Sequence, residues 1–197
     1  MGTTMAECGK RTWLAFLLFA LLFTPLTAWA RELRSGARVP INYLPQAALV
    51  DQCDKPVSFS ALKGQALLVG FIHASCEGIC EMLTAKMVNI GKQLDSALGN
   101  SVMMVTVTTD PVKDRPAELD AYARKQGAVG LGWLFLTGPR AEVSKVLKVY
   151  KVPEGESSHV HDLYLIGSDG HQVRRYNGAE LDATEVAADI RNAVARR

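Results

Sequence analysis

Two cysteines four positions apart are the residues of this sequence best suited to chemistry. Cys76 and Cys80 follow the apolar run 65–72 and open a segment whose apolar residues repeat at helical spacing. Residues four apart on a helix share one face, and the Cα separation of about 6 Å expected there suits a disulfide. A helix N-terminus also favours the thiolate form of Cys76. The pair therefore predicts either a metal site or a redox-active disulfide.

A metal site on this pair needs a third ligand. Two thiolates with one imidazole suit copper, whereas structural zinc normally takes a fourth protein ligand. His159 and His161 both precede the predicted strand 163–166, in the loop that a thioredoxin-like sheet places against the cysteine helix. His73 lies at a strand end just before the first cysteine, and His171 is expected in an exposed hairpin turn. Spacing alone does not separate His159 from His161, and His73 also stays within reach.

The alternative hypothesis is an enzyme, a thiol–disulfide oxidoreductase or redox sensor in which Cys76 attacks and Cys80 resolves the mixed disulfide. Thioredoxin-type oxidoreductases use a C-x-x-C spacing and place a cis-proline in the loop before the strand at 163–166. Here the segment 157–161 contains histidine and no proline. This difference favours metal binding over rapid disulfide exchange. The two hypotheses separate at the ligand histidine, which only copper binding requires.

The rest of the chain predicts the elements that position these residues. Short apolar runs alternate with amphipathic helical segments in the order βαβαβαββα. This order is typical of an α/β thioredoxin-like fold, with helices covering both faces of a central mixed β-sheet. An N-terminal β-hairpin is expected at 49–51 and 57–60. The predicted strands are 65–72, 101–108, 131–136, 163–166 and 172–176, and the predicted helices are 79–98, 116–126, 141–149 and 184–195.

The first thirty residues have the features of a secretory signal. A basic pair precedes an apolar run at 13–23, and a small-x-small cleavage pattern ends at Ala30. The run is shorter than the roughly 20 residues that span a bilayer, and an uncleaved anchor over 13–29 is the alternative. The domain is expected to be periplasmic or otherwise extracytoplasmic, soluble after cleavage or tethered to the inner membrane. The expected organisation is a signal peptide or anchor at 1–30, a flexible lead-in at 31–40 and one domain at 41–197.

Composition and charge narrow the classes of partner. The chain has 197 residues, of which 48% are hydrophobic and 21% charged, with a formal net charge of +2. This is an ordinary globular composition, and without a block of Lys and Arg nothing indicates nucleic acid as a partner. We expect a monomer. Cys8 falls in the signal, and Cys53 lies in a polar turn where we expect a surface thiol.

Four ordered motifs together resemble the Sco/SenC family of copper chaperones. The first is the strand with its C-x-x-x-C motif, and the second is a D-P-x-x-D segment with Asp110 and Asp114 in the matching places. The third is a W-x-x-L-T-G stretch that begins at Trp133. The fourth is a histidine-plus-strand element whose ligand histidine stands five residues before an aromatic residue. Counting back from Tyr164 gives His159. The resemblance runs from about Pro45 to the C-terminus, through the segments 69–80, 108–116, 133–138 and 159–170.

This resemblance implies a function. It implies a periplasmic or membrane-tethered metallochaperone that holds one copper ion, as Cu(I), Cu(II) or both, through Cys76, Cys80 and His159. Delivery during cytochrome c oxidase assembly would follow, with the apo-oxidase copper-site subunit or another copper protein as the recipient. Some family members are thought to act as thiol reductants for the cysteines of the oxidase's dinuclear copper centre. The resemblance thus adds a recipient to the predicted site.

The sequence also departs from the family pattern. Glu77 and Glu81 replace prolines that commonly flank the cysteines, which adds carboxylates beside the site, and Ser158 replaces an aspartate before the ligand histidine. We expect Asp114 to cap the helix that starts near Pro116 rather than to contact metal. The methionines fall on faces otherwise filled by aliphatic residues, and we expect a core role for Met82, Met87, Met103 and Met104.

Overall fold

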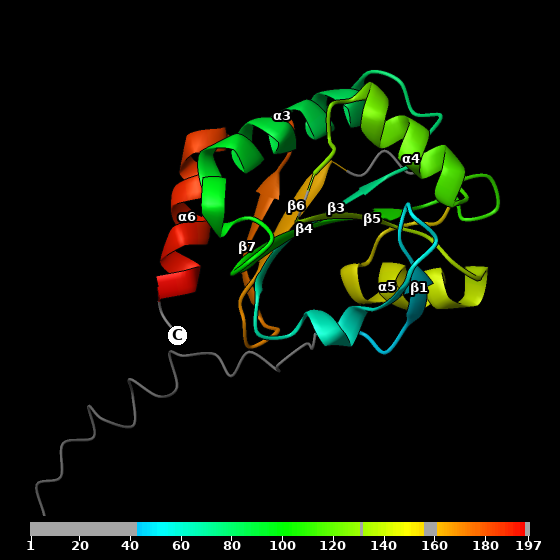
Figure 1. The fold of residues 1–197 in the computed structure, drawn as a ribbon, viewed down its shortest axis with the longest axis horizontal. Helices are drawn as coiled ribbons and strands as arrows, with labels where there is room; N and C mark the ends of the chain where they lie inside the picture. Colours follow the sequence, from blue (N-terminus) through cyan, green and yellow to red (C-terminus); the bar gives the residue numbers. More distant parts are fainter. Residues whose placement is uncertain (1–42, 131, 156–160, 196–197) are drawn as a thin grey trace, which may run out of the picture. The chain divides into compact units, whose positions relative to one another are not determined.

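A central five-stranded sheet organises the molecule (Figure 1). The computed structural model describes residues 43–130, 132–155 and 161–195, which belong to one compact unit. The strand order is β5-β4-β3-β6-β7, with β3, β4 and β5 parallel and with β6 antiparallel to β3 and β7 antiparallel to β6. The strands are β3 Ala66–Ile72, β4 Val102–Thr108, β5 Trp133–Leu136, β6 Asp162–Ile166 and β7 Gln172–Asn177.

Helices cover both faces of this sheet. Residues of α3, α4 and α6 share one buried apolar cluster with one side of the sheet. Residues of α5 share the cluster on the other side with the 3-10 helix η1 and with an antiparallel hairpin, β1–β2. The predicted thioredoxin-like α/β fold and its N-terminal hairpin are thus confirmed. These elements are β1 Ala48–Val50, β2 Pro56–Ser58, η1 Phe59–Leu62, α3 Ile79–Leu94, α4 Pro116–Lys125, α5 Arg140–Tyr150 and α6 Ala183–Ala195.

The central strand β3 shows why the cysteine helix packs where it does. Every residue of β3 is buried, and successive side chains alternate between the two clusters. Gly70 falls on the α3 side, where an added Cβ would lie 2.9 Å from Leu163 Cδ2 and 3.2 Å from Met87 Sδ. The missing side chain therefore allows α3 to lie close to the sheet, which places the N-terminus of α3 beside the end of β3.

Most predicted boundaries agree with the structure to within two residues, and α3 is the main exception. We predicted a helix over 79–98, but α3 ends at Leu94 and a 3-10 turn, η2 Asp95–Ala97, follows. The backbone of Asp95 has φ of 46°, which an α-helix does not accommodate. Met87 and Met104 are core residues as predicted, whereas Met82 is 36% exposed, so the core prediction is wrong there.

The N-terminal predictions lie outside the described residues. The proposed signal or anchor at 1–30, the lead-in at 31–40 and the first residues of the domain are not among them. Among the residues that are described, no helix is both long enough and apolar enough to cross a membrane.

Candidate metal centre

The two cysteines lie where β3 gives way to α3. They form a disulfide, with Cα atoms 5.8 Å apart, and both side chains are buried. The expected proximity of the sulfurs is confirmed, but the reason differs from the prediction. Only Cys80 lies on α3, which begins at Ile79, whereas Cys76 lies in a preceding turn closed by its own amide and the carbonyl of His73 at 3.0 Å. A loop–helix junction, rather than one helix face, therefore brings the two sulfurs together.

His73 brings an imidazole to the same place. Its side chain is buried, with Nδ1 3.1 Å from the hydroxyl oxygen of Ser75. Its Nε2 is buried too and has no hydrogen-bond partner among the described residues. One ligand atom each from His73, Cys76 and Cys80 lie within 4.8 Å of one another. Of the histidines that the sequence offers as a third ligand, His73 is thus the one that the described residues place beside the two sulfurs.

Asp114 holds the loop that carries these residues. Its carboxylate oxygen Oδ2 accepts hydrogen bonds from the Thr108 hydroxyl at 2.5 Å and from the Ala74 amide at 3.0 Å. Burial raises the pKa of Asp114, and the two hydrogen bonds oppose that rise. The capping prediction is wrong, because Arg115 occupies the N-cap position of α4 and makes no capping hydrogen bond through its side chain to the described residues. Asp114 instead ties the segment before Cys76 to the end of β4.

His159, the predicted ligand, lies in the segment 156–160 and therefore outside the described residues. The residues that flank this segment are described. Gly155 donates its amide to the carbonyl of Thr109 at 2.8 Å, and Thr109 donates its own to Ile72 at 2.8 Å. On the other side, β6 begins at Asp162, directly after His161, and runs antiparallel to β3, with Val69 paired with Tyr164. Both flanks thus lie at the end of β3 that leads into the cysteines.

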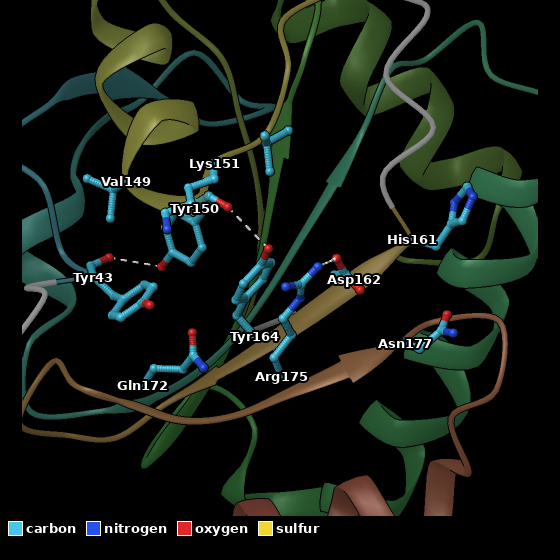
Figure 2. Close-up of a pocket in the computed structure, with 11 residues that line it drawn as sticks. Tyr43, Val149, Tyr150, Lys151, His161, Asp162, Tyr164, Gln172, Arg175 and Asn177 are labelled. Carbon is cyan, nitrogen blue, oxygen red and sulfur yellow. Dashed lines mark hydrogen bonds and ion pairs between the residues drawn. The ribbon is translucent and has the colours of Figure 1, made fainter. Parts of the chain in front are cut away.

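The remaining histidines take different places. His161 is not part of the His73–cysteine group, although its buried Nδ1 also lacks a partner within the described part of the chain. Figure 2 shows its ring turned away from the neighbouring tyrosines. His171 is exposed next to the turn between β6 and β7, as predicted. The sequence alternative of His161 as a ligand therefore receives no support from this side-chain position.

The carboxylates beside the cysteines point elsewhere. Glu81 pairs with Lys125, the last residue of α4, at 2.9 Å and accepts a hydrogen bond from the side-chain amide of Gln126, which follows α4, at 3.1 Å; these contacts lower the pKa of Glu81. Glu77 is exposed. Since Glu81 is engaged by α4, it is an anchor between helices rather than a ligand. Cys53 is an exposed free thiol, as predicted, at a turn that Asp51 closes.

A pocket on the other side of the sheet has a different character (Figure 2). It has a volume of about 850 Å³ and is lined by Tyr43, Tyr150 and Tyr164. The Tyr150 hydroxyl donates to the carbonyl of Tyr43 at 2.9 Å, and the Tyr164 hydroxyl donates to that of Tyr150 at 3.2 Å. Arg175 pairs with Asp162 and lies 5.7 Å from the centre of the Tyr164 ring. These tyrosines belong to the cluster that excludes the cysteines.

Comparison with known proteins gives a consistent family. The SCO1/SenC family model matches residues 40–195. The chain is 34% identical over 164 residues to the SCO1 protein homolog of Bacillus subtilis, a match that covers 78% of this chain and 84% of that protein.

Two solved structures extend this similarity. The chain is 30% identical to BsSco, which is described as a member of the Sco family of cytochrome c oxidase assembly proteins with a disulfide switch. That match has a TM-score of 0.65 over 81% of this chain and 98% of the other. It is 26% identical to Bradyrhizobium japonicum ScoI with copper bound, with a TM-score of 0.59 over 75% of this chain and 96% of that one.

Proposed function

The chain belongs to the SCO1/SenC family, and from that premise we propose that it binds one copper ion through Cys76, Cys80 and His159. We further propose that it delivers this copper in cytochrome c oxidase assembly. The copper-bound ScoI structure supports the metal, and the description of BsSco as a member of a family of oxidase assembly proteins supports the destination. Copper here is cargo, which the protein must both hold and release.

One observation carries the proposal: the buried sulfurs of Cys76 and Cys80 lie together at the end of β3, where the imidazole of His73 shows that nitrogen ligands also fit. Thiolate and imidazole ligands are soft enough to hold copper, and neither suits a hard ion such as magnesium. Opening the disulfide takes two electrons and two protons from a dithiol-type reductant and yields two thiols. Copper then displaces the thiol protons, so we expect its affinity to fall as the pH is lowered.

The flanks of the segment 156–160 support His159 as the third ligand. β6 begins directly after His161 and runs antiparallel to β3, and His159 is two residues away from His161. Two residues span at most about 7 Å of chain. An imidazole on that tether starts from the same end of β3 as the cysteines. Ser158, next to it, offers a hydroxyl where the family commonly has a carboxylate.

We place the protein outside the cytoplasm, with the apo-oxidase copper-site subunit as the recipient. The signal-like features of 1–30 support this location, and the segment 13–29 would serve as the tether if it is not removed. An oxidising compartment also explains the need for a reductant before copper loading, because the Cys76–Cys80 pair is a disulfide in the structure.

Copper stoichiometry of the reduced protein tests the proposal. The purified chain should bind one copper ion and, with Cu(II), show a thiolate-to-copper charge-transfer band. Cys76→Ser should abolish the band, whereas Cys53→Ser, which removes an exposed thiol, should keep it. His159→Ala should weaken binding or shift the band, with the exposed His171→Ala as the matched control. A wild-type protein without stoichiometric copper would contradict the proposal.

The Cys76–Cys80 disulfide itself favours a second candidate function. A thiol–disulfide oxidoreductase or redox sensor would cycle this pair without any metal. Its test is the reduction of a protein disulfide by the dithiol form, followed as the rate of substrate thiol release. Exchange that needs both cysteines and survives His159→Ala would favour this activity. No exchange above the Cys76→Ser background would exclude it.

A further inference from the structure

We propose that His73 is a further copper ligand, so that His73, Cys76 and Cys80 still hold one copper ion when His159 is removed. The inference rests on the proposed copper binding and adds a ligand that the binding proposal does not contain. It begins from the distance between the donors, because one nitrogen and two sulfurs already lie within 4.8 Å of one another. All three residues come from one continuous segment, from the end of β3 into the first turn of α3.

The distances suit a single ion. Metal–sulfur and metal–nitrogen bonds of about 2.3 and 2.0 Å set the donors of a three-coordinate site about 3.7 to 4.0 Å apart. The widest of the observed donor separations, at most 4.8 Å, therefore needs to close by about 1 Å. Reduction separates the two sulfurs, and the turn that carries Cys76 can take up this adjustment because it precedes the regular helix.

The state of the His73 ring points to a missing partner. The side chain is 6% exposed, yet its buried Nε2 makes no hydrogen bond to any residue that the structure describes. Buried polar atoms in native proteins nearly always have a partner. When Nδ1 donates to the Ser75 hydroxyl, Nε2 carries a lone pair available to a metal. That hydrogen bond also fixes the ring orientation, as outer partners of metal-bound histidines do.

The surroundings hold His73 in place before any metal arrives. Asp114 accepts a hydrogen bond from the amide of Ala74, the residue that follows His73. A second hydrogen bond from Thr108 fixes the Asp114 carboxylate on β4. The nitrogen donor is therefore supported from a neighbouring strand of the central sheet, and a supported donor loses less freedom when it binds an ion.

Cu(I) affinity of the full-length reduced protein, measured by competition with a chromophoric Cu(I) chelator, tests the inference. In a His159→Ala background we expect one Cu(I) per chain with two sulfur donors and one nitrogen donor by X-ray absorption. Adding His73→Ala should lower the affinity at least tenfold and remove the nitrogen donor. Adding His161→Ala, which removes a ring whose buried nitrogen also lacks a partner among the described residues, should change neither.

A second measurement does not depend on the fold of the His73 variant. With 15N-labelled histidine in the His159→Ala protein, Cu(I), which is diamagnetic, should shift the Nε2 resonance of His73 and leave that of His161 in place. An unshifted His73 resonance in a copper-loaded protein overturns the inference. Loss of all copper on His159→Ala alone also overturns it while leaving the proposed function intact. Failure of the wild type to bind copper overturns both.

Discussion

The cysteine end of the sheet and the tyrosine-lined pocket differ in the kind of polar atoms that they bring together. In the pocket, the Tyr150 and Tyr164 hydroxyls donate to backbone carbonyls. At the cysteine end, a buried histidine nitrogen lacks a partner within the described residues, beside two sulfurs. The pocket offers volume and the cysteine end offers ligands. Three potential ligand atoms gathered in one place therefore indicate a binding site for a metal better than the size of a pocket does.

Copper binding is expected to show the largest difference between the two regions. Cys80→Ser leaves one sulfur, and we expect stoichiometric copper binding to fall to background because a single thiolate cannot complete a soft site. Tyr150→Phe removes a hydroxyl from the pocket and should leave copper binding unchanged. Copper per chain after dialysis, determined by elemental analysis, measures both. Loss of copper binding in Tyr150→Phe would instead indicate that the metal site depends on the pocket side of the sheet.

Removal of the Asp114 carboxylate should have the next largest effect. Asp114→Ala leaves the Thr108 hydroxyl and the Ala74 amide without their acceptor, at a cost of about 1 to 3 kcal/mol each in the free energy of unfolding. We also expect about tenfold weaker copper binding, since the loop before Cys76 loses its support. Urea unfolding of the copper-free protein and chelator competition measure the two effects.

Asp110→Ala is the matched control, because the backbone of Asp110, rather than its carboxylate, bonds to Thr108. Asp110→Ala should change the free energy of unfolding and the copper affinity by less than Asp114→Ala does. Equal losses in the two variants would mean that charge in this loop matters and that the hydrogen bonds of Asp114 do not.

The fold was readable from the sequence because its strands are bounded apolar runs. The segment 65–72 is apolar on both faces, which is typical of the centre of a sheet covered on two sides. Proximity of Cys76 and Cys80 was readable too, since a helical turn and the observed loop–helix junction give nearly the same Cα separation. A short distance in sequence constrains position in space even when the local structure differs from the expected one.

Roles that depend on tertiary contacts were not readable in this way. Asp114 precedes a helix and resembles a cap, and its real partner Ala74 lies 40 positions earlier in the chain. Spacing alone does not decide whether His73 is a ligand, because it does not indicate where a buried side chain points. Its signal was present in the sequence, as a polar residue directly after a buried strand and three positions before a cysteine. Tyr43 and Tyr150, 107 positions apart, carried no joint pattern at all.

The pH dependence of stability sharpens the contrast between the two regions. Because burial raises the pKa of Asp114 above 3.8, the folded protein holds this proton to a higher pH than the unfolded chain does. Its contribution to folding is thus fully present below the unfolded pKa and is lost as the pH rises through the folded pKa. Asp114→Asn does not titrate and removes this dependence. The stability of the wild type relative to the variant should therefore decline as the pH rises from about 4 towards neutrality.

Unfolding curves of both copper-free proteins at a series of pH values measure this difference. The free energy of unfolding of Tyr164→Phe, which is altered in the pocket, should change with pH in parallel with that of the wild type, because tyrosine does not titrate in this range. Parallel profiles for the wild type and Asp114→Asn would show that this carboxyl titrates alike in the folded and unfolded chains.

The smallest effect belongs to the pocket. Tyr164→Phe removes the hydroxyl that donates to the Tyr150 carbonyl at 3.2 Å and leaves the ring in place against Arg175. One neutral hydrogen bond contributes about 1 kcal/mol, and we expect a loss of about that size in the free energy of unfolding. Copper affinity should stay the same, because the ring lies in the apolar cluster that excludes both cysteines. A change in copper affinity without a change in the free energy of unfolding would reveal a connection through β6, which contains Tyr164 and begins directly after His161. The tyrosine-lined pocket and the cysteine end of the sheet would then not be independent of each other.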